Sequence, residues 1–274
     1  MTHPLTYPRQ HDDALAELLD PFSAQRVAGL INLPGCRVLE VGAGGGGFAR
    51  FLADRVGAHG RVFALDVNPR IEFTHPQLTV VTSDLTRDEL PGDLDLVHAR
   101  LTLNHIPERH TVLTRLLHTL APGGVLLVED WWASNTDMVM HARRPEDVRL
   151  YHRFQHTLGR LFDAGGTDRT WARHIHGAML AGGLTDVSTV IHATAWTGGG
   201  PGCRLVRSTI GQLWDRLLAA GLSHDDLIEV SELLDDPELV LAGHPLYSTA
   251  GYRSAQRRAQ QFRVAGLESL PGQA

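Results

Sequence analysis

Residues 38–49 read VLEVGAGGGGFA, a short apolar run followed by a segment in which five of six residues are glycine. The apolar run at 37–41 predicts a buried strand, and GFARFLADRVG at 47–57 predicts a helix, so the glycines fall in the turn between them. Gly42 and Gly44 allow a tight turn and let a ligand approach bare backbone. The helix that follows offers unpaired N–H groups at its start. The stretch therefore predicts a ligand-binding loop of an α/β fold.

The same alternation of strand and helix continues along the first half of the chain. Further strands are predicted at 61–66, 78–82, 94–99 and 124–130, a helix at 107–120, and extended structure again at 184–196 and 244–254. Several of these strands are continuous apolar runs, which is typical of a parallel sheet covered by helices on both faces. We expect an α/β fold with a doubly wound, mostly parallel seven-stranded sheet and helical cap insertions.

The chain divides into five predicted parts. They are an N-terminal helical lid (1–30), an α/β core (31–135), a helical cap insertion (136–183), the rest of the core sheet with a further helical insertion at about 200–240 (184–254), and a C-terminal tail (255–274). The lid carries a possible break at Pro21, because proline lacks the N–H that a helix interior needs. The cap insertion is rich in Arg and His.

Composition excludes several functions. The 274-residue chain is 43% hydrophobic and 20% charged, as in an ordinary soluble globular protein. A net charge of −6 argues against a nucleic-acid partner, and the lack of a long apolar run argues against a membrane span. All 25 basic residues are Arg, which excludes lysine chemistry such as Schiff bases. With no signal peptide pattern and two isolated cysteines, Cys36 and Cys203, we expect a cytoplasmic protein, either a monomer or a homodimer.

Two cofactors fit the glycine loop. Gly42, Gly44 and Gly47 satisfy the GxGxxG pattern of dinucleotide binding, which would make the chain an NAD-dependent oxidoreductase. Glu40, just before the loop, instead suits the ammonium of a methionine moiety and would repel a pyrophosphate. Asp66, which ends the next strand, can hold the ribose hydroxyls of either cofactor. The loop and Glu40 together favour S-adenosylmethionine (SAM).

A third acidic position supports that preference. Asp84 follows the strand at 78–82 and can accept a hydrogen bond from an adenine amino group, with Leu85 packing on the ring. The alternative is that Asp84 is a helix cap or a turn residue. The segment LHTLAPGGVLLVED at 117–130 reads as the helix–turn–strand unit that is typical of the fifth strand in SAM-binding sheets.

The chain as a whole resembles the class I SAM-dependent small-molecule methyltransferases of actinobacteria, relatives of the ubiquinone and menaquinone methyltransferases. The segments that carry the likeness are 38–69, 93–113, 120–132, 165–187 and 233–237. The resemblance implies SAM as cofactor, S-adenosylhomocysteine (SAH) as product and a small-molecule acceptor. The chain departs from the family pattern at Trp131–Trp132 and His11–Asp12, where substrate specificity would be set. A SAM-binding protein without methyl transfer would carry the same binding residues.

The resemblance also completes the expected cofactor site. It implies that backbone at Arg100–Leu101 contacts the methionine part and that Tyr7 folds over the cofactor; the alternative is that Tyr7 only anchors the N-terminus. The predicted cofactor-binding residues are Tyr7, Glu40, Gly42, Ala43, Gly44, Asp66, Val67, Asp84, Leu85, Arg100 and Leu101. No metal site is expected, because His174 and His176 do not share a helix face.

Methyl transfer needs mainly proximity, because the sulfonium is already activated. A general base is required only where the acceptor must lose a proton, and the candidates by position are His105, His98 and Asp130, with His105 preferred. The alternative for His105 is a hydrogen bond that shapes its loop. Arg100 is expected to orient the substrate or the SAM carboxylate, or else to form a structural ion pair.

Trp131, Trp132 and, with weaker support, Trp196 are the predicted acceptor contacts. The first two follow the fifth strand, and at least one of an adjacent pair should face the pocket because side chains alternate along extended chain. An aromatic wall favours a flat or hydrophobic acceptor, such as an aromatic specialised metabolite. The alternative for all three is packing within the cap.

Overall fold

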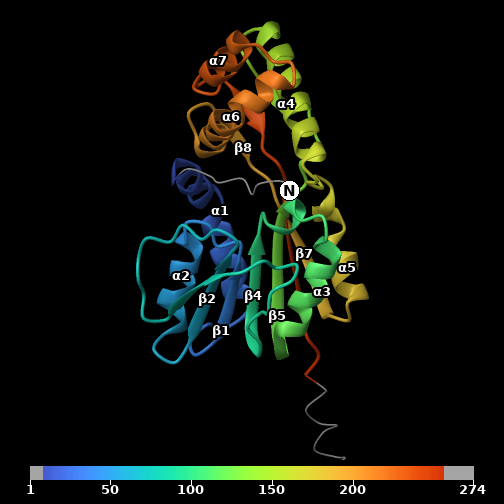
Figure 1. The fold of residues 1–274 in the computed structure, drawn as a ribbon. Coiled ribbons are helices and arrows are strands. Elements are labelled where there is room, and N and C mark those ends of the chain that lie inside the picture. Colours follow the sequence, from blue (N-terminus) through green and yellow to red (C-terminus); the bar gives the residue numbers. More distant parts are fainter. Residues whose placement is uncertain (1–8, 256–274) are drawn as a thin grey trace, which may run out of the picture.

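The computed structural model describes residues 9–255, in which a seven-stranded sheet forms the lower lobe (Figure 1). Its strands are β1 (Arg37–Val41), β2 (Arg61–Asp66), β3 (Leu78–Thr82), β4 (Leu94–Arg100), β5 (Leu120–Trp131), β7 (Thr185–His192) and β10 (Leu246–Tyr252). Their order across the sheet is β3-β2-β1-β4-β5-β10-β7. β1 to β5 pair in parallel, and β10 runs antiparallel to both β5 and β7. The predicted doubly wound, mostly parallel seven-stranded sheet is confirmed.

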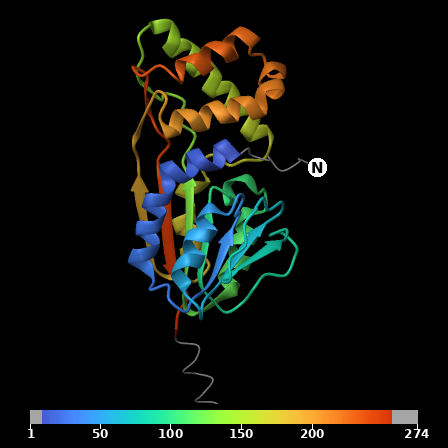
Figure 2. The same ribbon diagram turned by 90° about the vertical axis from the view of Figure 1, so that its left-hand side faces the viewer.

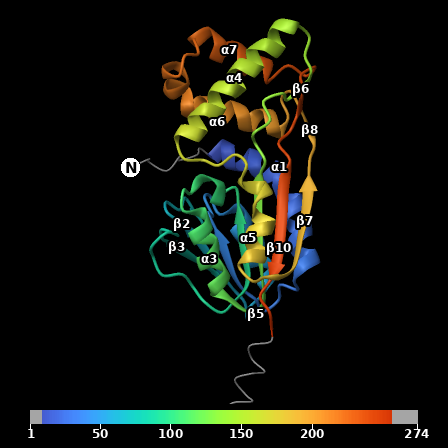
Figure 3. The same cartoon turned by 90° about the vertical axis from the view of Figure 1, so that its right-hand side faces the viewer.

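Helices cover both faces of the sheet, which is why its central strands are apolar along their length. α1 (Arg9–Leu30) and α2 (Gly47–Val56) pack on one face, and α3 (Arg109–Thr119) and α5 (Ile175–Ala181) on the other (Figure 3). In β1, Val38 belongs to the core under α1 and α2, and Leu39 to the core under α3 and α5. Because side chains alternate along a strand, each central strand supplies both cores.

The helix α1 is continuous through Pro21, where a break was possible. It bends in its middle, so that its first half runs beneath the upper lobe and its second half lies along the sheet (Figure 2). A proline inside a helix removes one backbone hydrogen bond and bends the helix without ending it. The bend brings Asp12 and Asp20 over the ends of the parallel strands, where they meet Arg70 and Arg100.

The upper lobe is a cap built from two separate stretches of the chain. It contains β6 (Val139–His141), α4 (Pro145–Ala164), β8 (Ala195–Thr197), α6 (Pro201–Ala219), α7 (His224–Leu233) and β9 (Val240–Ala242). The three short strands pair in the order β6-β9-β8, and the helices share one apolar core. The stretch 136–183, expected as one cap insertion, is divided in the structure. α4 joins the cap, whereas the short helix η2 (Trp171–Arg173) and α5 bury Trp171 and Ile175 against the sheet. No helix within residues 9–255 is long and apolar enough to cross a membrane.

Candidate functional site

The glycine loop joins β1 to α2 at the edge where the parallel strands end. Gly42 has a φ of +71°, and a Cβ atom there would lie 2.1 Å from Oγ1 of Thr102, so only glycine fits. Asp66, at the tip of β2, accepts hydrogen bonds from the backbone N–H groups of Gly44 (2.9 Å) and Asn68 (2.8 Å). The acid expected at the ribose therefore also fixes the loop.

Backbone at the end of β4 is strained beside this loop. Leu101 has a φ of +50°, a backbone conformation that residues other than glycine rarely adopt. Its N–H donates to the carbonyl of Glu129 at 2.8 Å, which holds the turn against β5. Strain of this kind concentrates at functional sites, and here it lies where the methionine part of a cofactor is expected.

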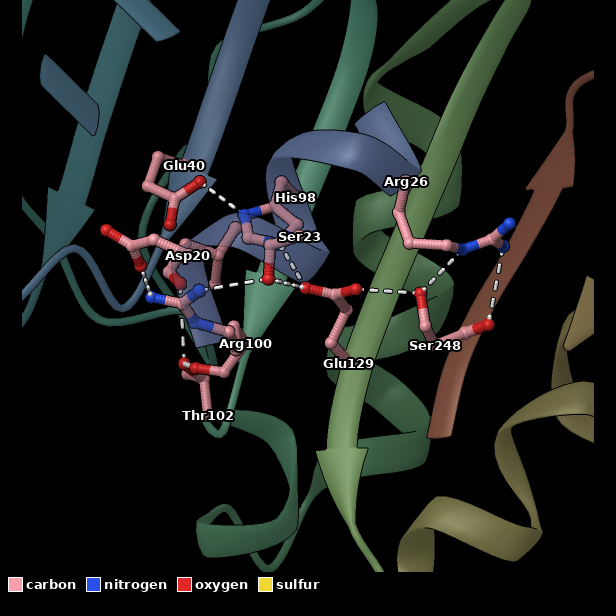
Figure 4. A network of polar contacts seen from close by, with 10 residues as sticks. Asp20, Ser23, Arg26, Glu40, His98, Arg100, Thr102, Glu129 and Ser248 are labelled. Atoms are coloured by element: carbon pink, nitrogen blue, oxygen red, sulfur yellow. Dashed lines mark hydrogen bonds and ion pairs between the residues drawn. The ribbon is translucent and has the colours of Figure 1, made fainter. Parts of the chain in front are cut away.

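A buried charge network runs across the same sheet edge from Glu40 (Figure 4). Nδ1 of His98 lies 2.6 Å from a carboxylate oxygen of Glu40, and Nε2 lies 3.1 Å from one of Glu129. Burial alone would lower the pKa of His98, but the two carboxylates outweigh it and raise that pKa to about 9. Burial likewise opposes ionisation of Glu129, yet its hydrogen bond with His98 lowers its pKa to about 2. The network therefore holds an imidazolium between two carboxylates.

The helix α1 closes this network. Ser23 donates a 2.5 Å hydrogen bond to Glu129, and Arg100 donates to Ser23 (2.9 Å) and to Asp20 (2.7 Å). Arg100 thus forms the ion pair that was one of its two expected roles. Asp20 and Ser23 were not identified as site residues from the sequence. The signal that could have found them is their three-residue spacing, which places both on one face of the predicted helix.

Two of the three expected proton acceptors are unsuited to that role. Both ring nitrogens of His98 are engaged by carboxylates, and the ring is fully buried. Asp130 is fully buried as well, and its burial raises its pKa well above the usual range, which favours the protonated form. A protonated acid cannot take up a further proton from an acceptor. His105 is the remaining candidate of the three.

His105 ends a short helix, η1 (Leu103–His105), that follows β4. His105 is an exposed residue, and its Nδ1 lies 3.1 Å from Oγ1 of Thr167. Desolvation, with a smaller contribution from Arg109, lowers its pKa to about 4, so the imidazole is neutral and can accept a proton. Thr167 also lines a cavity of about 410 Å³, together with polar residues that include Arg109, Ser134, Asp163, Asp168 and Arg169.

Of the three tryptophans expected at the acceptor, Trp131 and Trp196 lie together and Trp132 has other neighbours. Trp131 and Trp132 are both partly buried, and their rings contact different residues. The Trp131 ring lies 5.9 Å from those of Trp196 and His244, whereas Trp132 lies under the guanidinium of Arg173 at 5.6 Å. Trp196 is 4% exposed in the cap core, which makes it a packing residue here because an acceptor cannot reach it. None of the three tryptophans lines the cavity described above.

Of the residues expected to contact adenine, only some have side chains that are free to do so among those that the structure describes. Val67 is 52% exposed and offers an apolar surface after β2. Asp84 accepts hydrogen bonds from the backbone and the hydroxyl of Thr86 (2.9 and 2.6 Å), which is the turn role that was its alternative. Leu85 is 7% exposed and packs in the core under α3, which leaves little of its side chain for contact with an adenine ring. Tyr7 lies outside the described residues.

Comparison with known proteins shows similarity to methyltransferases. A profile of the family described as "Methyltransferase domain" matches residues 7–187. Methyltransferase str2 of Strobilurus tenacellus is 34% identical over 97 residues, which cover 34% of this chain and 35% of that protein. A ubiquinone biosynthesis O-methyltransferase of Xanthomonas campestris is 32% identical over 120 residues, which cover 40% of this chain and 49% of that protein. The chain thus matches about a third to a half of the length of these relatives.

A solved structure shares the fold. Phosphoethanolamine N-methyltransferase 2 of Haemonchus contortus, in complex with phosphomonomethylethanolamine and SAH, superposes with a TM-score of 0.54. The two sequences are 15% identical, and the superposition covers 88% of this chain and 56% of the other. At this identity the likeness concerns the arrangement of strands and helices.

Proposed function

The chain belongs to the methyltransferase domain family, and on that premise we propose that it transfers a methyl group from SAM to a small-molecule acceptor. The observation that carries the proposal is the buried carboxylate of Glu40 directly before the glycine loop. One oxygen of Glu40 is held by His98, and the other is turned away from that ring (Figure 4). We assign this second oxygen to the ammonium of the methionine moiety.

A dinucleotide fits this edge less well. In a dinucleotide fold the backbone at the second glycine of the loop approaches the pyrophosphate. Here the N–H of Gly44 is taken by the Asp66 carboxylate, and Glu40 adds a second negative charge close by. A pyrophosphate would be repelled by these charges, whereas the sulfonium and ammonium of SAM would be attracted. An NAD-dependent oxidoreductase is therefore the less favoured alternative.

Methyl transfer requires little of the protein beyond the alignment of SAM and the acceptor. Methyl transfer is an in-line displacement at the methyl carbon of SAM, in which the acceptor forms a bond to that carbon and the sulfur leaves as the thioether of SAH. Alignment of two bound reactants contributes up to about 7–11 kcal/mol in the best intramolecular cases. Where the acceptor must lose a proton, we assign the role of base to His105, which is neutral and accessible. Arg109 and Arg169 line the neighbouring cavity, where Asp168 and Asp163 hold their guanidinium groups.

The acceptor that we propose is a small molecule with an aromatic or hydrophobic ring, of the kind found in specialised metabolism. Trp131 and Trp132 remain partly exposed after β5, and these aromatic side chains favour an acceptor that contains a ring. The polar cavity beside His105 supports a hydroxyl or amine as the methylated group, and its volume of about 410 Å³ is within the range of small-molecule sites. A cytoplasmic location, the lack of a nucleic-acid partner and a monomeric or dimeric state stay predictions.

Transfer is tested with SAM that carries a trideuterated methyl group and a panel of phenols, hydroquinones and indoles, read by mass spectrometry. We expect the label on an acceptor, with SAH formed in equal amount. His105→Gln should slow transfer by roughly 10²–10⁴-fold while SAM affinity is retained. His118→Gln, at the exposed end of α3, serves as the control. SAM binding with no labelled product from any member of the panel would instead support a SAM-binding protein without transfer.

A further inference from the structure

The first half of α1 also reaches the glycine loop, through a contact outside the network around His98. The guanidinium of Arg70 donates to both carboxylate oxygens of Asp12, at 3.1 Å from Nη2 and 2.9 Å from Nη1. Arg70 follows β2, and its backbone N–H donates to the carbonyl of Gly44 at 2.9 Å. The ion pair therefore joins α1 to the loop after β2, across the glycine loop.

This ion pair rests directly on bare backbone. A Cβ atom on Gly45 would lie 2.7 Å from Oδ2 of Asp12, and one on Gly44 would lie 3.4 Å from Nη2 of Arg70. The side chains of Arg70 and Asp12 are only 26% and 28% exposed. Burial raises the pKa of Asp12, a shift that Arg70 opposes, so the carboxylate is held in a partly desolvated position. The two glycines thus leave room above the loop for a carboxylate and a guanidinium in contact.

A second arginine at this edge, Arg100, is held by side chains of α1. It donates to Ser23 and Asp20, and its guanidinium lies over the ring of Phe48 at 5.0 Å. Only 13% of its side chain is exposed. A ligand that recruited Arg100 would disturb Ser23, which also holds Glu129. A ligand that recruited Arg70 would displace Asp12 and leave the contact of Ser23 with Glu129 in place.

We propose that Arg70 binds the carboxylate of the cofactor's amino-acid moiety and that Asp12 takes this position in the ligand-free chain. The inference rests on the proposed function, since it concerns the SAM molecule expected at this loop. A planar guanidinium recognises a carboxylate through two parallel hydrogen bonds, which is the geometry that Asp12 shows. SAM carries its carboxylate and its ammonium on one carbon atom. Arg70, which lies against Gly44, and Glu40, two residues before Gly42, then hold these opposite charges.

Binding then exchanges one carboxylate for another at Arg70. Asp12 loses this partner, and the first turns of α1 lose the ion pair that holds them against the glycine loop. Asp20 and Ser23 keep the middle of α1 on the strand ends through Arg100 and Glu129. A ligand without the amino-acid group gains nothing from Arg70, which separates this contact from every contact to the adenosine.

Calorimetric titration with SAH and with 5′-methylthioadenosine tests the inference, because both ligands contain the adenosine and the thioether and only SAH carries the amino acid. Arg70→Met should weaken SAH binding by roughly 10–100-fold, the range for a hydrogen bond to a charged group, and leave methylthioadenosine binding unchanged. Asp12→Asn should bind SAH at least as tightly as the wild type. Arg149→Met, exposed on α4 and paired with Glu146, is the matched control.

Equal losses for SAH and methylthioadenosine in Arg70→Met would overturn the inference, because Arg70 would then support the loop as a whole. Weaker SAH binding by Asp12→Asn would also overturn it, because Asp12 would be a ligand contact and not a stand-in. Thermal unfolding of each variant without ligand separates lost fold from lost affinity. A wild type that binds neither ligand contradicts the proposed function, whereas a preference for SAH that survives in Arg70→Met contradicts only the role of Arg70.

Discussion

Glu40→Gln is expected to weaken the binding of SAM by roughly 100-fold, as measured by calorimetry. Glutamine keeps an oxygen that accepts the hydrogen bond from His98, so the geometry of the network is preserved. The charge that faces the ammonium is lost, and Glu40 is only 4% exposed, so little water is present to screen that loss. The variant should unfold close to the wild-type temperature when no ligand is present.

Glu129→Gln is the matched control for this experiment. It removes the second carboxylate from the same imidazolium, at 3.1 Å from Nε2, but it lies on β5, two strands away from the glycine loop. We expect SAM affinity to change little in Glu129→Gln, and likewise in Trp131→Ala on the acceptor side. Equal losses of affinity in the three variants would contradict the separation of a cofactor side from an acceptor side.

His98→Leu is expected to lower the free energy of unfolding by about 3–5 kcal/mol, the cost of removing one partner from a buried ion pair. The substitution leaves the carboxylates of Glu40 and Glu129 close together without the cation between them. Urea unfolding near neutral pH measures the loss. His176→Gln is the control, since His176 is partly buried on α5 and bonds the uncharged hydroxyl of Thr189. Similar losses in both variants would argue against a charged His98.

The same network predicts how stability depends on pH. The pKa of His98 is raised to about 9, so its contribution is complete below its ordinary pKa of 6.5 and is lost as pH rises through about 9. The pKa of Glu129 is lowered to about 2, so its contribution is complete above 4.5 and is lost as pH falls through about 2. The stability difference between the wild type and His98→Leu should therefore shrink as pH rises from 6.5 to 9. A difference that stays constant over that window would contradict the charged imidazolium.

The sheet was predictable from the sequence because its signals are local. Apolar strand runs, the glycine loop and the helices between them each lie within about ten residues of chain. The cap was harder, because its core joins segments that are far apart in sequence, such as Met138, Phe154 and Leu241. Local periodicity marks the helices at 145–164 and 175–181 alike, and it does not show that the first packs in the cap and the second on the sheet.

The candidate site divides in the same way. Glu40 and Asp66 could be placed because each ends a strand next to the glycine loop. The surroundings of His98 could not, because its two carboxylates lie 58 and 31 residues away in sequence and meet only through strand order. His98 therefore looked like a free base in the sequence and holds a buried charge in the structure. The contact of Ser23 with Glu129 spans 106 residues and has no sequence signal of its own.

We assign the glycine loop and Glu40 to the binding of SAM. The most direct measurement is a titration of the wild-type protein with SAM and, under the same conditions, with NAD. We predict saturable one-to-one binding of SAM and no detectable binding of NAD. Saturable binding of NAD together with no detectable binding of SAM would contradict the claim.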